Sequence, residues 1–222
     1  MDSPGIIYGA QGPDYKRLYY SDEQAALKVP ITLQAGYGKL EAGMALAKNG
    51  SASATRLGRF IPYDPDATIT GAENAPGRAY LVQSSGTSAT DLYVTIDDSY
   101  KFAVGDDVYI SDDTTTAENL GAITAIDRST YSHMAKITVT TATGGTSFTT
   151  ARFAHLTVEG FNTCVGILEK TVDTGEGSTA NGALATMILG NCVLYTGSLL
   201  NLDANARTDL SATQIGIYTY IK

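Results

Sequence analysis

The sequence has no tryptophan, two histidines, two cysteines and six prolines among its 222 residues. Two cysteines, Cys164 and Cys192, cannot supply the four ligands of a typical structural zinc site. We expect both to be small buried side chains. A disulfide between them stays open, although proteins of the cytosol rarely keep one. A chain of this length buries enough surface to fold without either kind of cross-link.

Charge and long apolar runs are also scarce. Charged residues make up 17% of the chain, against about 25% in an average soluble domain, and the net charge is −8. A surface of that sign repels phosphate backbones and anionic membranes, so we expect no nucleic acid and no membrane as partners. The best apolar run, residues 185–189, is far shorter than the ~20 residues that span a bilayer. Residues 1–5 lack the features of a secretion signal, which predicts synthesis and residence in the cytosol.

The residues that are abundant are typical of β-structure. The chain has 23 glycines, 14 tyrosines and 43% hydrophobic residues, with turn-forming clusters between short alternating segments. This composition predicts an all-β protein and excludes a coiled coil, a helical bundle and a disordered acidic chain. The length corresponds to one large or two small domains.

Residues 1–28 are predicted to form an extended N-terminal arm, because glycines and Pro13 interrupt any regular element. One or two helical turns are expected within residues 22–27. The arm is rich in apolar and aromatic side chains that a short segment cannot bury by itself. Either a partner buries them or the arm wraps its own domain. These candidate binding residues are Ile6, Ile7, Tyr8, Tyr15, Leu18, Tyr19 and Tyr20.

Alternation of apolar and polar residues begins at Val29 and predicts a strand through Leu33. A turn into a strand follows at residues 40–46, and prolines favour extended backbone at residues 59–65. Residues 79–159 hold about six further strands, enough for a small antiparallel barrel or sandwich. These strands are expected around residues 92–96, 108–110, 123–126, 137–139, 148–153 and 156–158.

The last part of the chain, residues 162–222, returns to longer apolar segments. Strands are expected at residues 165–168 and from residue 187 to residue 195. Asp203 is expected to cap a short helix that runs to about Ala212. A final paired strand is predicted near the end, where Ile215, Ile217 and Ile221 share one face.

Residues suited to catalysis are few. A hydrolytic triad needs a histidine, and the chain has only His133 and His155. Neither lies near a nucleophile motif, so we expect each to make a local hydrogen bond or to face solvent. The glycine-rich stretches 36–39 and 143–147 lack phosphate-loop spacing and are interpreted as turns. The sequence therefore predicts no catalytic residue and no enzyme.

Adjacent aspartates occur three times, at residues 97–98, 106–107 and 112–113. Carboxylates clustered on loops suit Ca²⁺, which prefers hard oxygen ligands. Aspartate is also a common turn residue between strands, and no EF-hand spacing is present. We interpret the pairs as turn residues and predict no metal site and no cofactor.

Two separated blocks of the chain carry a resemblance. Residues 29–46 pair a strand with Leu40-Glu-Ala-Gly-Met-Ala-Leu46, and residues 57–64 end in Pro-Tyr-Asp. Residues 164–173 hold Gly-Ile-Leu and end in Val-Asp, and residues 190–195 read Gly-Asn-Cys-Val-Leu-Tyr. In this order they resemble the bacteriophage head decoration, or capsid cement, proteins. The segment from Leu210 to Tyr218 also resembles that family's short helix leading into a final Gly-Ile strand.

The resemblance implies a fold and a function. It implies a small β-sandwich/barrel decoration domain from residues 29–65 plus 162–222, with residues 79–159 as an inserted antiparallel β-barrel-like subdomain. It also implies a structural protein of the virion that binds the major capsid protein on the outer capsid surface. Such proteins act as homotrimers at three-fold or quasi-three-fold sites and stabilise the mature shell, and the N-terminal arm would supply contacts.

The insertion departs from the family pattern and leaves two further hypotheses open. The first is a virion-attached host- or glycan-binding β-module, with residues 79–159 as the reader and tyrosines as stacking platforms. The second is a hydrolase that uses His133 or His155 with a nearby aspartate.

Overall fold

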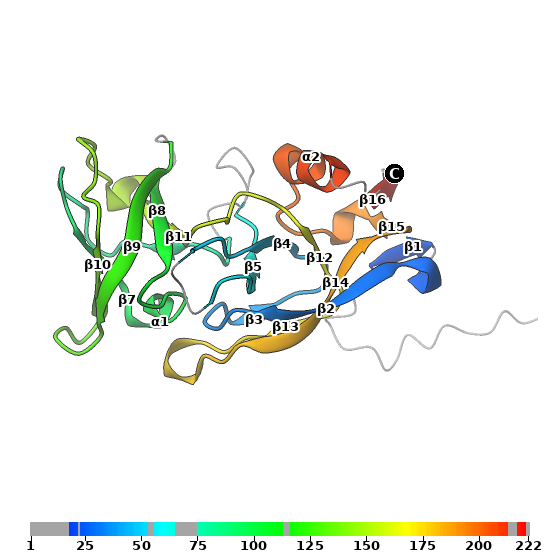
Figure 1. Cartoon of the computed structure of the whole chain (residues 1–222), viewed down its shortest axis with the longest axis horizontal. Helices are drawn as coiled ribbons and strands as arrows, with labels where there is room; N and C mark the ends of the chain where they lie inside the picture. Colours follow the sequence, from blue (N-terminus) through cyan, green and yellow to red (C-terminus); the bar gives the residue numbers. More distant parts are fainter. Residues whose placement is uncertain are drawn as a thin grey trace, which may run out of the picture.

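The computed structural model describes residues 18–21, 23–52, 56–64, 75–112, 116–212 and 217–220. Figure 1 shows two lobes of β-structure side by side, one made of strands β6 to β11 and the other of the remaining strands with helix α2. The prediction of an all-β fold is confirmed. Among the described residues, no helix is long and apolar enough to cross a membrane.

The lobe that includes helix α2, which we call the barrel lobe, contains a closed barrel with the strand order β12-β14-β2-β5-β4. β2 and β5 are parallel, and the other neighbouring strands are antiparallel. The longest pairing joins β2 to β14, from Leu33↔Ala183 to Leu27↔Gly190. The strand bounds are β2 Leu27–Leu33, β4 Ala45–Lys48, β5 Phe60–Pro62, β12 Gly166–Leu168 and β14 Ala183–Gly190.

Alternation along these strands fills the inside of the barrel with aliphatic side chains. The strand expected at residues 29–33 is present and begins two residues earlier, at Leu27. Every second residue near its end, Ile31 and Leu33, is buried. Five side chains that are at most 2% exposed come one from each of the five barrel strands: Leu33, Leu46, Ile61, Ile167 and Ile188.

Shorter elements extend the barrel lobe. β15 lies between β1, which runs antiparallel to it, and β16, which runs parallel to it. β3 and β13 form a separate two-stranded sheet, and helix α2 lies beside the barrel (Figure 1). The bounds are β1 Tyr19–Ser21, β3 Lys39–Leu40, β13 Val172–Asp173, β15 Cys192–Tyr195, β16 Ile217–Tyr220, α2 Ala204–Ala212, and the 3₁₀ helices Glu23–Ala25, Gly177–Thr179 and Thr196–Ser198.

The second lobe, which we call the inserted lobe, is a nearly closed six-stranded sheet with the order β6-β11-β8-β9-β10-β7. Its two outer strands approach each other through a bridge between Leu81 and Val94. The Val82 amide also donates to the Tyr93 carbonyl at 2.9 Å. The bounds are β6 Ala79–Tyr80, β7 Asp91–Thr95, β8 Asp107–Ser111, β9 Glu118–Asp127, β10 Met134–Val139 and β11 His155–Val158.

Two local predictions in this lobe are wrong. Residues 148–153, expected as a strand, contain the 3₁₀ helix Thr150–Arg152, after which Phe153 takes a left-handed conformation with φ of 53°. Ile96, expected at the end of a strand, begins helix α1 (Ile96–Ser99). The Thr95 hydroxyl accepts from the Asp98 amide and so stabilises the first turn of that helix.

The inserted lobe adjoins the barrel lobe at both of its ends. The Asp64 amide donates to the Phe161 carbonyl at 3.0 Å, and the Gly50 amide of the barrel lobe donates to the Glu159 carbonyl at 3.0 Å. The strands of the inserted lobe all fall between Asp64 and Phe161 in the sequence. The division of the chain into separate domains stays a prediction.

A buried polar network of Gln34, Asn49 and Asp106 fastens the lobes together. Asn49 Nδ2 donates to Gln34 Oε1 at 2.9 Å and faces Asp106 Oδ1 at 3.5 Å. Gln34 Nε2 donates to the Lys101 carbonyl at 2.8 Å, and Asp106 Oδ2 accepts from the Ala103 amide at 2.8 Å. Because an unsatisfied buried polar group is costly, these bonds fix one lobe relative to the other.

Candidate functional site

Four of the predicted binding residues, Ile6, Ile7, Tyr8 and Tyr15, lie outside the described residues. Leu18 lies within them, is 5% exposed and belongs to the chain's own hydrophobic core. Its carbonyl accepts from the Tyr195 amide at 3.0 Å, just before strand β1 begins. The chain is therefore attached to the barrel lobe from Leu18 onward.

Tyr19 is also fixed against the barrel lobe. Its hydroxyl donates to Glu169 Oε1 at 3.1 Å, and the Lys28 ammonium lies 5.0 Å from the centre of its ring. Lys28 forms an ion pair with the same carboxylate. For Tyr20 the structure describes the backbone, which lies in β1. Leu18 and Tyr19 thus contact their own domain, which is the second of the two alternatives for this segment.

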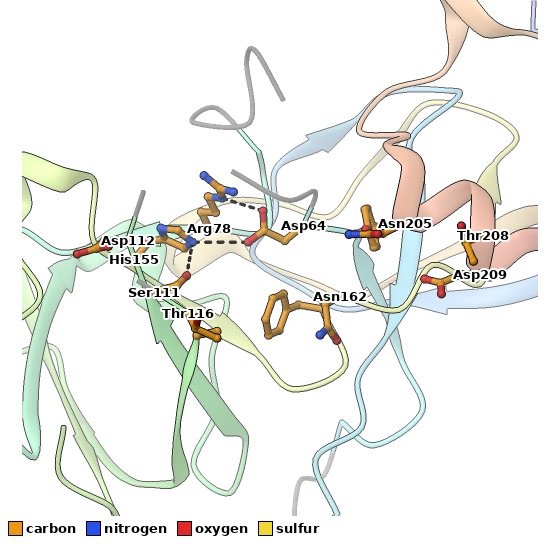
Figure 2. Close-up of a pocket in the computed structure, with 13 residues that line it drawn as sticks. Asp64, Arg78, Ser111, Asp112, Thr116, His155, Asn162, Asn205, Thr208 and Asp209 are labelled. Carbon is orange, nitrogen blue, oxygen red and sulfur yellow. Dashed lines mark hydrogen bonds and ion pairs between the residues drawn. The ribbon is translucent and has the colours of Figure 1, made fainter. Parts of the chain in front are cut away.

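A group of polar side chains from both lobes converges between the lobes. It lines a cleft of about 530 Å³, which we call the interlobe cleft. Figure 2 shows that the barrel lobe contributes Asp64, the inserted lobe contributes Ser111 and His155, and helix α2 contributes Asn205 and Asp209. The remaining lining residues are Tyr63, Arg78, Asp112, Thr116, Ala117, Phe161, Asn162 and Thr208.

An ion pair between the lobes forms the floor of the interlobe cleft. Arg78 Nε lies 2.7 Å from Asp64 Oδ1, and both side chains are 3% exposed. Burial opposes the charge of the guanidinium, but the Asp64 carboxylate outweighs it and raises the pKa of Arg78. Removing either partner would leave a buried charge without compensation. The pair is therefore a rigid part of the cleft.

His155 connects the inserted lobe to this ion pair. Its Nδ1 lies 2.9 Å from the Phe153 carbonyl, which only accepts, so Nδ1 carries the hydrogen. In the neutral ring Nε2 then accepts from the Ser111 hydroxyl, which lies 2.9 Å away. Asp64 Oδ2 lies 3.6 Å from the same Nε2 atom (Figure 2).

This arrangement differs from a hydrolytic triad. In a triad the serine and the carboxylate contact opposite nitrogens of the ring, so that the acid orients the base. Here Ser111 and Asp64 both face Nε2 of His155. The geometry suits a hydrogen-bonded connection between the lobes. His133, the other candidate, is exposed and lies 3.5 Å from the Ser132 hydroxyl.

Helix α2 forms one wall of the interlobe cleft. Asp203 caps the helix as predicted, because its Oδ1 accepts from the Ala206 amide at 2.6 Å. The same carboxylate accepts from the Tyr63 hydroxyl at 3.0 Å, and burial together with this bond raises the pKa of Tyr63. Asp209 Oδ2 accepts from the Cys164 amide at 2.8 Å. These bonds hold the wall to the barrel lobe.

The paired aspartates have separate structural partners. Asp98 accepts from the Thr95 hydroxyl at 2.9 Å and forms an ion pair with Lys101 at 2.7 Å. Asp106 belongs to the buried polar network, and Asp113 lies outside the described residues. Within the described ranges, no three His, Cys, Asp or Glu side chains are grouped closely enough to hold a metal ion. Cys164 and Cys192 are buried thiols and form no disulfide.

Sequence reasoning named His155 and Asp112 without placing them in a common site, and it missed the other lining residues of the interlobe cleft. Ser111 and Arg78 lie 44 and 77 residues from His155 in the sequence, and no local motif links them. Asp64 was part of the Pro-Tyr-Asp segment and had no assigned role. The pairing of β11 with β8 and β6 brings Ser111 and Arg78 close to His155, and Asp64 joins them from the barrel lobe.

No protein-family model, curated protein or solved structure matches this chain.

Proposed function

We propose that this protein binds the outer surface of a phage capsid, as trimers at three-fold or quasi-three-fold sites, and stabilises the mature shell. The observation that carries the proposal is the spatial pairing of the two sequence blocks that resemble head decoration proteins. β4, from the first block, pairs with β12, from the second, through Leu46↔Gly166. β5 pairs with both β4 and β2, and all are strands of one barrel. The blocks therefore form one structural unit although about a hundred residues separate them.

The attachment of the N-terminal segment supports the same function. Leu18 and Tyr19 tie the chain to strand β15, and residues 1–17 precede this fixed point. They carry Ile6, Ile7, Tyr8 and Tyr15, the apolar residues proposed to contact the major capsid protein. Contacts that exist only on the assembled lattice stabilise that lattice by mass action.

The experiment that tests this function is a sedimentation assay. Purified protein is mixed with undecorated mature capsids, the capsids are pelleted, and the bound copies per shell are counted. We expect the number of copies bound per shell to saturate at a whole multiple of the number of three-fold and quasi-three-fold sites. A well-folded sample that does not pellet with the shells would contradict the proposal.

A matched pair of variants tests the arm. Replacing Ile6, Ile7 and Tyr8 together by serine should abolish binding to capsids, because these side chains are proposed to be buried at the contact. Leu184→Ser removes an apolar side chain that is 83% exposed on the barrel lobe, and should leave binding unchanged. Deletion of residues 2–17 is the stronger test, since it keeps Leu18 in the core. Equal binding by the arm variants and the wild-type protein would refute the arm's role.

A further inference from the structure

The interlobe cleft presents hydrogen-bonding groups that the fold does not use. The side-chain amides of Asn162 and Asn205 make no hydrogen bond to another described residue and both line the cleft. Asn162 comes from the loop after β11 and Asn205 from helix α2 (Figure 2), and both residues are exposed to solvent at the edge of the cleft. Each amide offers two donor hydrogens and an acceptor oxygen. The rim of the cleft is therefore equipped for a ligand that both donates and accepts.

The polar side chains at the floor of the cleft, in contrast, are already bonded to one another. Arg78 and Asp64 neutralise each other at 2.7 Å, and His155 and Ser111 bond to each other at 2.9 Å. These groups are held in place before any ligand arrives, which lowers the entropic cost of binding.

The charges around the cleft narrow the chemical class of ligand. With Arg78 compensated by Asp64, the other charged side chains of the lining are the carboxylates of Asp112 and Asp209, which disfavour an anion. A metal ion is disfavoured too, because the described residues hold no suitable group of three ligands. An uncharged ligand rich in hydroxyl groups fits best, since each hydroxyl can donate to a carboxylate or accept from an amide.

The size and the aromatic side chains of the cleft agree with this class. Its volume of about 530 Å³ lies within the range of roughly 300–1,000 Å³ that is common for small-ligand sites, which often lie between domains. Phe161 is partly exposed and adds apolar surface to the polar lining, whereas Tyr63 is only 1% exposed. A sugar ring combines hydroxyl groups with apolar C–H faces that pack on such rings.

We propose that the interlobe cleft binds a neutral saccharide of one or two rings, with Asn162 and Asn205 as the side chains that bind its hydroxyl groups. The hypothesis of a glycan reader placed the site in residues 79–159 alone, whereas this site needs the barrel lobe and helix α2 as well. Binding of a saccharide here is independent of capsid binding.

The test uses the full chain and a panel of defined sugars. Glucose, galactose, mannose and N-acetylglucosamine, with disaccharides of each, are titrated against the protein by saturation-transfer NMR. At least one sugar should bind saturably. If no sugar of the panel binds, the proposal is overturned.

Variants then locate the site. Asn162→Ala removes one amide from the inserted side, and Asn205→Tyr places a bulky ring in the cleft from helix α2. Each variant should weaken sugar binding about tenfold or more. Asn162→Ala loses a hydrogen bond to the sugar, and Asn205→Tyr fills space that the sugar would occupy. Ser211→Tyr, an exposed position on the same helix away from the cleft, should bind like the wild-type protein. Unchanged affinity in both cleft variants would overturn the proposed site, and thermal melting of each variant checks that it is folded.

Discussion

Asp106 and Asp107 are neighbours in the sequence, but their environments differ. Asp106 is fully enclosed in the buried polar network, whereas Asp107 begins strand β8 and is half-buried. Burial raises the pKa of Asp106, although the hydrogen bond from the Ala103 amide opposes the shift. The folded protein therefore favours the protonated form of Asp106 more than the unfolded chain does.

This shift predicts a pH dependence of stability. For a carboxyl group with a raised pKa, the stabilising contribution is fully present below the unfolded pKa of about 3.9 and is lost as the pH rises through the folded pKa. Asp106→Asn removes the titration and keeps an oxygen that accepts from Ala103. We expect the stability of the wild-type protein, relative to this variant, to fall between about pH 4 and pH 7. Urea unfolding at both pH values measures it, and a constant difference would contradict the prediction.

Cys164 should be chemically inert in the folded protein. The thiol is 1% exposed, and burial raises its pKa to about 12. At pH 8 the reactive thiolate then makes up only about one part in ten thousand. We expect iodoacetamide to modify Cys164 only after unfolding, as counted by intact mass before and after addition of urea. Rapid modification of the folded protein would show that the residue is accessible.

At the scale of single residues, the sequence predicts roles that depend on near neighbours. The cap at Asp203 was predictable because a capping residue acts on amides two or three positions away. The pair of His155 with Ser111 was not, because its partners meet only through strand pairing. The interlobe cleft belongs to this second kind.

Helix α2 depends on Asp203 for two interactions at once. The carboxylate accepts from the Ala206 amide and from the Tyr63 hydroxyl. Asp203→Ala should lower the free energy of unfolding by about 2–3 kcal/mol, because it loses a cap and leaves the buried Tyr63 hydroxyl without its acceptor. Asp203→Asn keeps an acceptor oxygen and should cost about 1 kcal/mol or less. Equal losses in the two variants would contradict this account.

Gly160, at the end of the inserted lobe, requires a backbone conformation that other residues rarely adopt. Its φ is +88°, and a Cβ atom there would lie 2.2 Å from the Lys48 carbonyl oxygen. Gly145 has a φ of +62° with open space around it, so it shares the conformation without the close contact. Gly160→Ala should destabilise the fold by at least about 2 kcal/mol more than Gly145→Ala. Thermal melting of both variants compares them directly.

At the scale of elements, alternation located most strands but not their exceptions. It predicted β2 and the inserted strands because half-buried strands show a period of two. It failed at residues 148–153, where Phe148 is buried and the 3₁₀ helix that follows leaves Phe153 half-exposed. The turn at Phe153 requires a left-handed backbone conformation, and the sequence has no glycine at this position to indicate it.

For the whole molecule, the buried polar network predicts that the lobes unfold together. Asn49 bonds to Gln34 in its own lobe and faces Asp106 in the other. Scanning calorimetry of the wild-type protein should therefore show one transition. Asn49→Ala leaves both neighbours without this amide, and should separate the melting of the two lobes. The exposed Asn181→Ala should retain the single transition, and two transitions in the wild-type protein would contradict the coupling.

The inserted lobe lies between two parts of the barrel lobe in the sequence, and this arrangement determines how the inserted lobe could be replaced. Asp64 and Phe161 are joined by one hydrogen bond of 3.0 Å. The two ends of the intervening segment therefore lie as close together as the ends of a short loop. The entropic cost of closing a loop grows only slowly with its length. A different cassette grafted between these two residues therefore needs adjoining ends, and it must also supply partners for Asp64 and Asn49, which Arg78 and Asp106 contact in this protein. The same position is a natural place to display a foreign domain.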